Sequence, residues 1–470
     1  MIKLSDFNFK LFVFIAFAAN LILRLYKIDL APFSYDESIS VKDTLLDFGH
    51  IKHEAEWDSN PPFYHYCLWI WAKLFGVSEF ALRSFSALLC SVTLLISALF
   101  IRKNFSKKSS FAFIILFSSH PIIFYYSQEA RSYCLILLLA CLTLISFKNS
   151  LDSPTIKKAL VLGLLNFLLI YTHYITFYIP LLQAIIVILF ERSALKWFSI
   201  SALFSLALAF LRFTKGQFQL ILGTSPNATS RAWLKKAEFT DLTDFITKMY
   251  FHYFFYILLV GYLCFIIYRY WNAIASKKRL IQFLWLLSIA VPIIHFIIGL
   301  FIPLFVDRYI LYSVMFSLIF LSISTTYLNS GYVLVILISV FGSYNLKITY
   351  KKDFDFKSVA NYVNLNQRNR SVIIHTKDLF GLFTYYYDRQ QYLKMDKNGD
   401  FNLQNKNIFT ARDLNDFKQL PIHYENDIML FQGFDNETTN KEIYEYFIHK
   451  GYSISNINGF HGLKFVLLTK

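Results

Sequence analysis

Acidic side chains gather in one stretch, residues 34–83, which directly follows the first apolar segment of the chain. About a quarter of the chain's 31 acidic residues lie in about a tenth of its length: Asp36, Glu37, Asp43, Asp47, Glu54, Glu56, Asp58 and Glu79. In a membrane protein such groups are costly unless they sit in water or hold a cation or a substrate. We therefore expect the chemistry of this protein to centre on residues 34–83.

Asp36 leads a polar stripe with the spacing of one helix face. Its members follow at i, i+4, i+7 and i+11: Asp36, Ser40, Asp43 and Asp47. A carboxylate at the start of such a helix, close to the membrane surface, suits a general base that acts on a hydroxyl or an amine. For Glu37 a structural role is equally open, because Ser34 with Glu37 three residues later has the pattern of a capping box.

Asp58 precedes a pair of prolines, Pro61 and Pro62. The prolines forbid a regular helix and predict a rigid turn there. A turn explains the prolines but not the carboxylate beside them. Asp58 is therefore a candidate substrate-binding residue.

Further charged and aromatic residues fall in short connections between later apolar segments. Glu129 and Arg131 either pair with each other or leave the guanidinium to bind a phosphate, with Tyr133 nearby. His173 is either a hydrogen-bonding residue at the membrane interface or a substrate or metal ligand. Arg308 and Tyr309 open a late apolar segment and suit a phosphate partner.

These residue types favour one kind of chemistry. Carboxylates suit deprotonation or a divalent metal ion, for which the candidate ligands are Asp36, Asp58, Glu129 and His173. Arginines suit a lipid-linked phosphate. The set predicts group transfer from a lipid phosphate at a membrane surface.

The composition explains where these residues must be held. The chain has 470 residues, of which 56% are hydrophobic and only 16% charged, whereas soluble domains have about 25% charged residues. A membrane span needs about 20 apolar residues. That length predicts a polytopic α-helical membrane protein with about 11 spans, at residues 9–26, 80–101, 109–126, 133–147, 156–172, 175–190, 197–213, 249–268, 280–301, 310–327 and 332–344. Residues 64–75 are aromatic and short, and predict a helix lying at the interface.

Basic residues predict the orientation. With the N-terminus inside, most short loops assigned to the cytoplasm are basic, as the positive-inside rule requires. The loops 34–79 and 213–247 and the C-terminus then face the opposite side. Lys347, Lys351 and Lys352 conflict with this placement, because they follow the last span on the outside. Flanking lysines and arginines also account for the net charge of +15, so we expect no nucleic-acid partner.

The composition changes near residue 347. Alternating polar and apolar segments predict helices at 358–365, 379–387 and 441–450 and strands at 371–375, 427–431 and 464–468. We therefore divide the chain into a transmembrane domain, residues 1–346, and a small extracytoplasmic α/β domain, residues 347–470.

At the residues named above the chain resembles a known group. It is similar to the membrane glycosyltransferases of the GT-C superfold, within the dolichyl-phosphate-mannose–protein mannosyltransferase-like family that includes lipid A aminoarabinose transferases. The resemblance rests on six motifs in family order: Asp36-Glu37, DSNPPFYHY from Asp58, FGVSEFALRSFSALL from Phe75, YYSQEARSY from Tyr125, YTHY from Tyr171 and DRYIL from Asp307. Many relatives have His-Pro-Pro where this chain has Asn60-Pro61-Pro62.

The resemblance implies an enzyme of the bacterial inner or plasma membrane that moves a sugar from a polyprenyl-phosphate donor to an extracytoplasmic acceptor. It implies an inverting displacement, with or without a metal ion, in which Asp36 and Glu37 form the catalytic pair and Asp36 is the base. The acceptor, whether lipid, glycan or protein, stays open, as does the sugar, a hexose or a pentose. The alternative is a polytopic transporter or lipid flippase, which would require charged or broken helices at mid-membrane.

Overall fold

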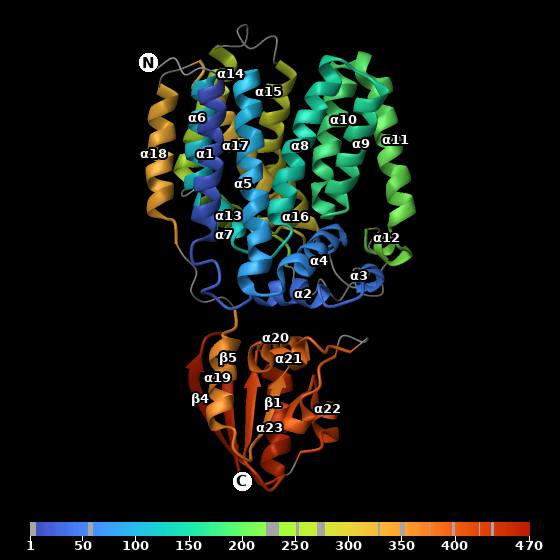
Figure 1. Ribbon diagram of the computed structural model, residues 1–470, viewed down its shortest axis with the longest axis vertical. Coiled ribbons are helices and arrows are strands. Elements are labelled where there is room, and N and C mark those ends of the chain that lie inside the picture. Colours follow the sequence, from blue (N-terminus) through green and yellow to red (C-terminus); the bar gives the residue numbers. More distant parts are fainter. Residues whose placement is uncertain are drawn as a thin grey trace. The chain divides into compact units, whose positions relative to one another are not determined.

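The computed structural model describes residues 6–54, 60–221, 235–250, 253–269, 278–327, 330–347, 353–375, 377–396, 400–422, 424–433 and 437–470 (Figure 1). The chain divides into two compact units. The first, the helical unit, comprises Met1–Tyr26, Gly49–Trp71 and Arg83–Ile348. The second, the C-terminal unit, comprises Thr349–Lys470 together with Lys27–Phe48 and Ala72–Leu82. Two segments of the acidic stretch therefore belong with the end of the chain.

Long apolar helices build the helical unit. Six are long and apolar enough to cross a membrane: Phe7–Leu25, Glu79–Asn104, Tyr133–Asp152, Arg192–Arg212, Arg279–Phe301 and Asp307–Ser324. A bent pair, Lys107–Ser119 with Pro121–Ser127, would make a seventh, and Tyr174–Phe190 and Tyr332–Tyr344 are shorter apolar helices. The chain is thus an integral membrane protein whose helices fall where the apolar segments predict them.

The helices that lie wholly or mostly in this unit, in chain order, are α1 (Asp6–Leu25), α3 (Phe48–Glu54), α4 (Phe63–Phe75), α5 (Glu79–Asn104), α6 (Lys107–Ser119), α7 (Pro121–Ser127), α8 (Tyr133–Asp152), α9 (Ile156–Ile170), η1 (Tyr174–Phe177), α10 (Tyr178–Phe190), η2 (Arg192–Ala194), α11 (Leu195–Arg212), α12 (Lys215–Ile221), α13 (Phe239–Tyr250), α14 (Tyr253–Arg269), α15 (Lys278–Trp285), η5 (Leu286–Ala290), α16 (Val291–Phe301), η6 (Asp307–Ile310), α17 (Leu311–Ser324) and α18 (Ser330–Tyr344). The end of α4 and the start of α5 belong to the C-terminal unit. Every residue of α17 is buried, so this helix forms the core of the unit. It packs against α6, α8, α14, α15 and η5.

One predicted span is broken. Residues 109–126 form α6 and α7, which meet at an angle of 63°. The break lies at His120, whose backbone is extended (φ −78°, ψ 116°) because the residue before a proline disfavours the helical region. Pro121 then begins α7, a position where its missing N–H costs nothing.

The C-terminal unit contains a five-stranded sheet in the order β2-β1-β3-β5-β4. Its strands are β1 (Ser371–His375), β2 (Ile408–Thr410), β3 (Ile428–Gln432), β4 (Ser453–Phe460) and β5 (Leu463–Thr469). The strands β2, β1 and β3 are parallel, whereas β5 and β4 run antiparallel. β1 has the predicted bounds, and β3 and β5 lie within a residue of theirs. β2 and β4 were not predicted.

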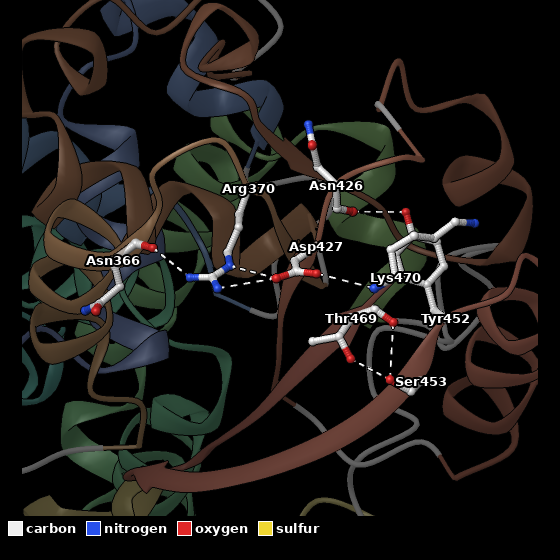
Figure 2. A network of polar contacts seen from close by, with 8 residues as sticks. All are labelled: Asn366, Arg370, Asn426, Asp427, Tyr452, Ser453, Thr469 and Lys470. Atoms are coloured by element: carbon white, nitrogen blue, oxygen red, sulfur yellow. Dashed lines mark hydrogen bonds and ion pairs between the residues drawn. The ribbon is translucent and has the colours of Figure 1, made fainter.

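The helices of this unit are α2 (Tyr35–Asp43), α19 (Phe356–Asn366), α20 (Lys377–Tyr387), α21 (Arg389–Tyr392), η7 (Gln404–Lys406), α22 (Leu414–Gln419) and α23 (Glu437–His449). α22 and α23 cover one face of the sheet, where Phe417 and Phe447 pack against Ile373, Leu430 and Val466. A polar network lies at the end of the sheet where β1, β3 and β4 begin and β5 ends (Figure 2). In it Arg370, before β1, donates from Nε and Nη2 to Asp427, before β3, at 3.3 Å, and Asp427 accepts from the Lys470 amide.

Candidate functional site

Asp36 and Glu37 lie in the first turn of α2, and a local motif fixes that turn. The Glu37 amide donates to Ser34 Oγ at 3.2 Å, and the Ser34 amide donates to Glu37 Oε2 at 2.9 Å. The capping box that the sequence offered for Glu37 is therefore confirmed. Glu37 is fully buried, whereas Asp36 is half-buried. The arrangement leaves Asp36 as the more accessible carboxylate of the pair. Of the stripe that was predicted, Asp47 lies beyond the end of the helix.

Asp58 lies outside the described residues. The chain after it is described from Asn60, and α4 begins at Phe63, directly after the paired prolines. The Phe63 amide donates to the Tyr171 carbonyl at 3.2 Å. The turn with its prolines is therefore tied to the segment that leads to His173.

Glu129 and Arg131 occupy the buried connection between α7 and α8. Glu129 is 7% exposed and Arg131 is 9% exposed. The Arg131 amide donates to the Glu129 carbonyl at 2.9 Å. Tyr133 begins α8, is buried, and packs its ring 4.7 Å from that of Tyr126. This connection thus holds a buried carboxylate and a buried guanidinium two residues apart.

His173 and Tyr309 meet in space although the sequence separates them widely. Their ring centroids are 4.4 Å apart. Nδ1 of His173 accepts from the Ile175 amide at 3.2 Å and so caps η1. Tyr309 lies in η6, which packs directly against η1. The structure therefore brings together two of the residues predicted to bind substrate.

Arg308 belongs to the same neighbourhood. Its guanidinium carbon lies 5.9 Å from the centroid of the Tyr309 ring, and its amide donates to Asp307 Oδ1 at 2.6 Å. Asp307 in turn forms an ion pair with Lys248 of α13. This ion pair was not predicted, because no signal in the sequence links α13 to η6.

Tyr126 connects the two groups of residues within the helical unit. This buried phenol lies within Coulombic range of Glu129, Asp307 and Arg308. The connection between α7 and α8 therefore adjoins η6. Of the predicted residues in this unit, the structure gathers Glu129, His173, Arg308 and Tyr309 around the short helices, and Arg131 and Tyr133 follow Glu129 directly.

Arg24 is a charged residue that sequence reasoning missed. It lies in the last turn of α1 and is fully buried. Its guanidinium donates to Ser127 Oγ at 3.3 Å and to the Phe117 carbonyl at 3.4 Å. The Arg24 carbonyl accepts from Gln128 Nε2 at 2.9 Å. Arg24 thereby holds the connection that carries Glu129 against α1. Its position in an otherwise apolar span was the signal that could have identified it.

Among the residues that the structure describes, no three His, Cys, Asp or Glu side chains form a group that could hold a metal ion. Glu129 and His173 do not form such a group with a third described ligand. Asp58 lies outside the described ranges.

The comparisons with known proteins agree with the family resemblance that the sequence motifs indicate. The family model for dolichyl-phosphate-mannose-protein mannosyltransferase matches residues 59–214. ArnT from Cupriavidus metallidurans bound to undecaprenyl phosphate has a similar fold, with a TM-score of 0.57 at 10% identity over 97% of this chain and 98% of that chain. Its apo state gives a TM-score of 0.55 at 11% identity, over 97% of each chain.

An archaeal structure shares the fold as well. The Archaeoglobus fulgidus oligosaccharyltransferase in complex with Zn and sulfate gives a TM-score of 0.51 at 13% identity, over 95% of this chain and 73% of that chain. No curated protein matches this chain. The family match and the shared fold together confirm the resemblance to the membrane glycosyltransferases of the GT-C superfold.

Proposed function

We propose, from the resemblance to GT-C enzymes, that this chain is an integral membrane glycosyltransferase that moves a sugar from a polyprenyl-phosphate donor to an extracytoplasmic acceptor. The observation that carries the proposal is the family match over residues 59–214. It includes the buried connection with Glu129, Arg131 and Tyr133 and extends to His173. The residues that gather in the helical unit are thus those of the matched region and of η6.

The donor class rests on the charges of the site and on a relative. ArnT, with the same fold, binds undecaprenyl phosphate. In this chain Arg131 and Arg308 supply guanidinium groups, each of which can bind two phosphate oxygens at once. We assign them to the phosphate of the donor. Tyr133, His173 and Tyr309 supply the aromatic and hydrogen-bonding surface for the sugar.

The reaction we propose is a single displacement. An acceptor hydroxyl or amine attacks the anomeric carbon, its bond to that carbon forms, and the bond from carbon to the phosphate oxygen breaks. Asp36 takes the acceptor's proton, and the electron pair leaves with the polyprenyl phosphate. The guanidinium groups stabilise the charge that grows on the leaving phosphate. Glu37 holds α2 through its cap, and Asp58 is a candidate contact to the substrate.

The proposal leaves a divalent metal ion open, with Asp36, Asp58, Glu129 and His173 as its candidate ligands. The proposal places the site on the extracytoplasmic face of a bacterial inner or plasma membrane, with about 11 spans and the C-terminal α/β domain on that same face. It leaves lipid, glycan and protein acceptors open.

A reconstituted transfer assay tests the proposal. Purified protein in proteoliposomes is supplied with undecaprenyl phosphate linked to a radiolabelled hexose or pentose and with membrane acceptors. We expect label to leave the donor lipid and to become attached to an acceptor, at a rate that Asp36→Asn lowers by about 10²- to 10⁴-fold. Label that crosses the bilayer while still attached to its donor lipid would identify a transporter or flippase instead.

A further inference from the structure

The C-terminal unit contains a hydrogen-bonded chain that ends at the segment carrying Asp36. The Phe33 amide donates to the Tyr386 hydroxyl oxygen at 2.7 Å. The Tyr386 hydroxyl donates to Glu79 Oε1 at 2.9 Å. Phe33 directly precedes Ser34, the cap of α2, and Glu79 begins α5. One phenol at the end of α20 therefore joins the two ends of the acidic stretch.

Tyr385 makes a second connection from α20 to Glu79 and Phe33. Its hydroxyl donates to Glu79 Oε2 at 2.9 Å, and its ring packs edge-on against Phe33 with 5.2 Å between the centroids. The Arg389 guanidinium lies over the Tyr385 ring, with its central carbon 3.7 Å from the ring centroid. Both oxygens of the Glu79 carboxylate are thus held by neighbouring phenols of one helix.

The electrostatics of this group match its geometry. Burial, and after it the negative charge of Glu79, raises the pKa of Tyr386 well above its usual range. The phenol therefore stays protonated and donates to the carboxylate. A hydroxyl that donates to a carboxylate is polarised and becomes a better acceptor for a second donor, here the Phe33 amide. Glu79 also lies at a helix N-terminus, where the macrodipole favours a negative charge.

We propose that Tyr386 is a positioning residue, which fixes the start of α2 and through it the carboxylate of Asp36. This inference rests on the proposed function, in which Asp36 is the base. α2 follows the anchored Phe33 amide after a single capping residue, and its own first amide, of Tyr35, donates to Asp353 Oδ2 at 3.3 Å, so these two bonds together fix the first turn. Displacement of a reacting group by about 1 Å costs on the order of 100-fold in rate. In this proposal the C-terminal domain helps to position Asp36, the catalytic base.

The test compares Tyr386→Phe with Tyr387→Phe in the full-length protein. Tyr387 is a matched control because it is adjacent, is also partly buried, and donates to Gln367 inside the domain, at 3.3 Å. Two quantities are measured: hydrogen exchange of peptides covering residues 27–48 and 72–82, and kcat and KM for the donor. We expect Tyr386→Phe to speed exchange at Phe33 and in α2 and to lower kcat about 10- to 100-fold with little change in donor KM. Tyr387→Phe should leave both quantities at the wild-type values.

A second variant separates positioning from general folding. Glu79→Gln alters the acceptor on α5 and leaves the C-terminal domain intact. The double variant Tyr386→Phe/Glu79→Gln should lose no more activity than the worse single variant, because both break one chain of hydrogen bonds. Additive losses in kcat, unchanged exchange in Tyr386→Phe, or faster exchange with unchanged kcat would each overturn the inference. A wild-type protein without transfer activity would overturn the proposed function instead, and the exchange measurement would still decide whether Tyr386 anchors α2.

Discussion

Asp36 and Glu37 are neighbours in the chain, but their carboxylates are in different surroundings. Glu37 is fully buried and accepts the Ser34 amide, whereas Asp36 is half-buried. We predict that Asp36→Asn folds and binds donor but loses about 10²- to 10⁴-fold in turnover, the usual contribution of a positioned base. Sugar transfer by purified protein at saturating donor checks this.

Glu37→Gln is the matched comparison. This substitution should mainly lower the free energy of unfolding, by about 1 kcal/mol, as the loss of other helix caps does. Thermal unfolding of the two variants therefore separates the roles. Asp36→Asn with activity within a few-fold of wild type would remove Asp36 from the base role and leave that role to Asp58 or Glu129.

Arg308 gives a second prediction at this scale. Its guanidinium lies by the ring of Tyr309, which itself contacts His173. We predict that Arg308→Lys weakens donor use although it keeps the charge, because an ammonium group cannot hold two phosphate oxygens in a planar fork. Donor KM measured for Arg308→Lys, Arg308→Ala and Arg131→Ala checks this.

Arg192→Ala is the control for these arginines, because Arg192 is exposed and bonds locally, to the Ile188 carbonyl. It should leave donor KM unchanged. Wild-type donor affinity in both Arg131→Ala and Arg308→Ala would exclude the phosphate assignment.

Residues whose partners lie nearby in the chain could be read from the sequence, and residues with distant partners could not. The capping box of Ser34 and Glu37 spans three positions, so its pattern is visible directly. The contact of His173 with Tyr309 and the ion pair of Lys248 with Asp307 depend on how helices pack. No local pattern encodes them. The same holds for Tyr386, which looks like one of several aromatic residues on α20.

At the scale of elements, apolar length predicted the helices well because the bilayer imposes it. Apolar length does not reveal the break at His120, because the apolar segment continues across it. The signal for the break is Pro121. In the sheet, β1 is a short, fully buried run, whereas β2 has only three residues and the sequence of β4 contains Asn456 and Gly459. Segments like β2 and β4 become strands by pairing with a neighbour, which a local pattern does not reveal.

The pair α9 and α11 offers a test of packing. A Cβ atom added at Gly163 would lie 2.5 Å from the Ser201 carbonyl oxygen, a backbone atom that cannot move aside easily. Small residues allow such close approach between membrane helices. We predict that Gly163→Ala lowers the thermal stability of the detergent-solubilised protein, by about 1–3 kcal/mol as for other overpacked sites.

Gly261→Ala on α14 is the control. A Cβ atom there meets nothing within 4 Å. That substitution should be neutral or stabilising, because alanine has the higher helix propensity. Equal melting temperatures for the two variants would show that α9 and α11 do not approach as closely as the structure has them.

At the scale of the whole molecule, the contacts of Tyr386 constrain the topology. Phe33 and Glu79 belong to the same compact unit as the C-terminal domain and bond to one of its side chains. Residues 27–48, the start of α5 and the C-terminal sheet must therefore share one side of the membrane. The chain must cross an even number of times between Glu79 and the sheet. Ten of the eleven predicted spans follow Glu79, and ten is even. In the orientation that the basic loops predict, Lys347 would then lie on the outer side, as an exception to the positive-inside rule.

Single cysteines at exposed positions test this parity. We replace the native cysteines Cys67, Cys90, Cys134, Cys141 and Cys264 by serine and introduce Asp47→Cys, Lys103→Cys or Lys418→Cys, one per protein. A membrane-impermeant maleimide should label positions 47 and 418 in intact cells and position 103 only after permeabilisation. Retained sugar transfer in the cysteine-free background shows that the native topology is kept. Labelling of 47 and 103 from one side would contradict the orientation inferred from the basic loops. Labelling of 47 and 418 from opposite sides would contradict the shared unit itself, because a hydrogen bond from Phe33 to Tyr386 cannot form across a bilayer.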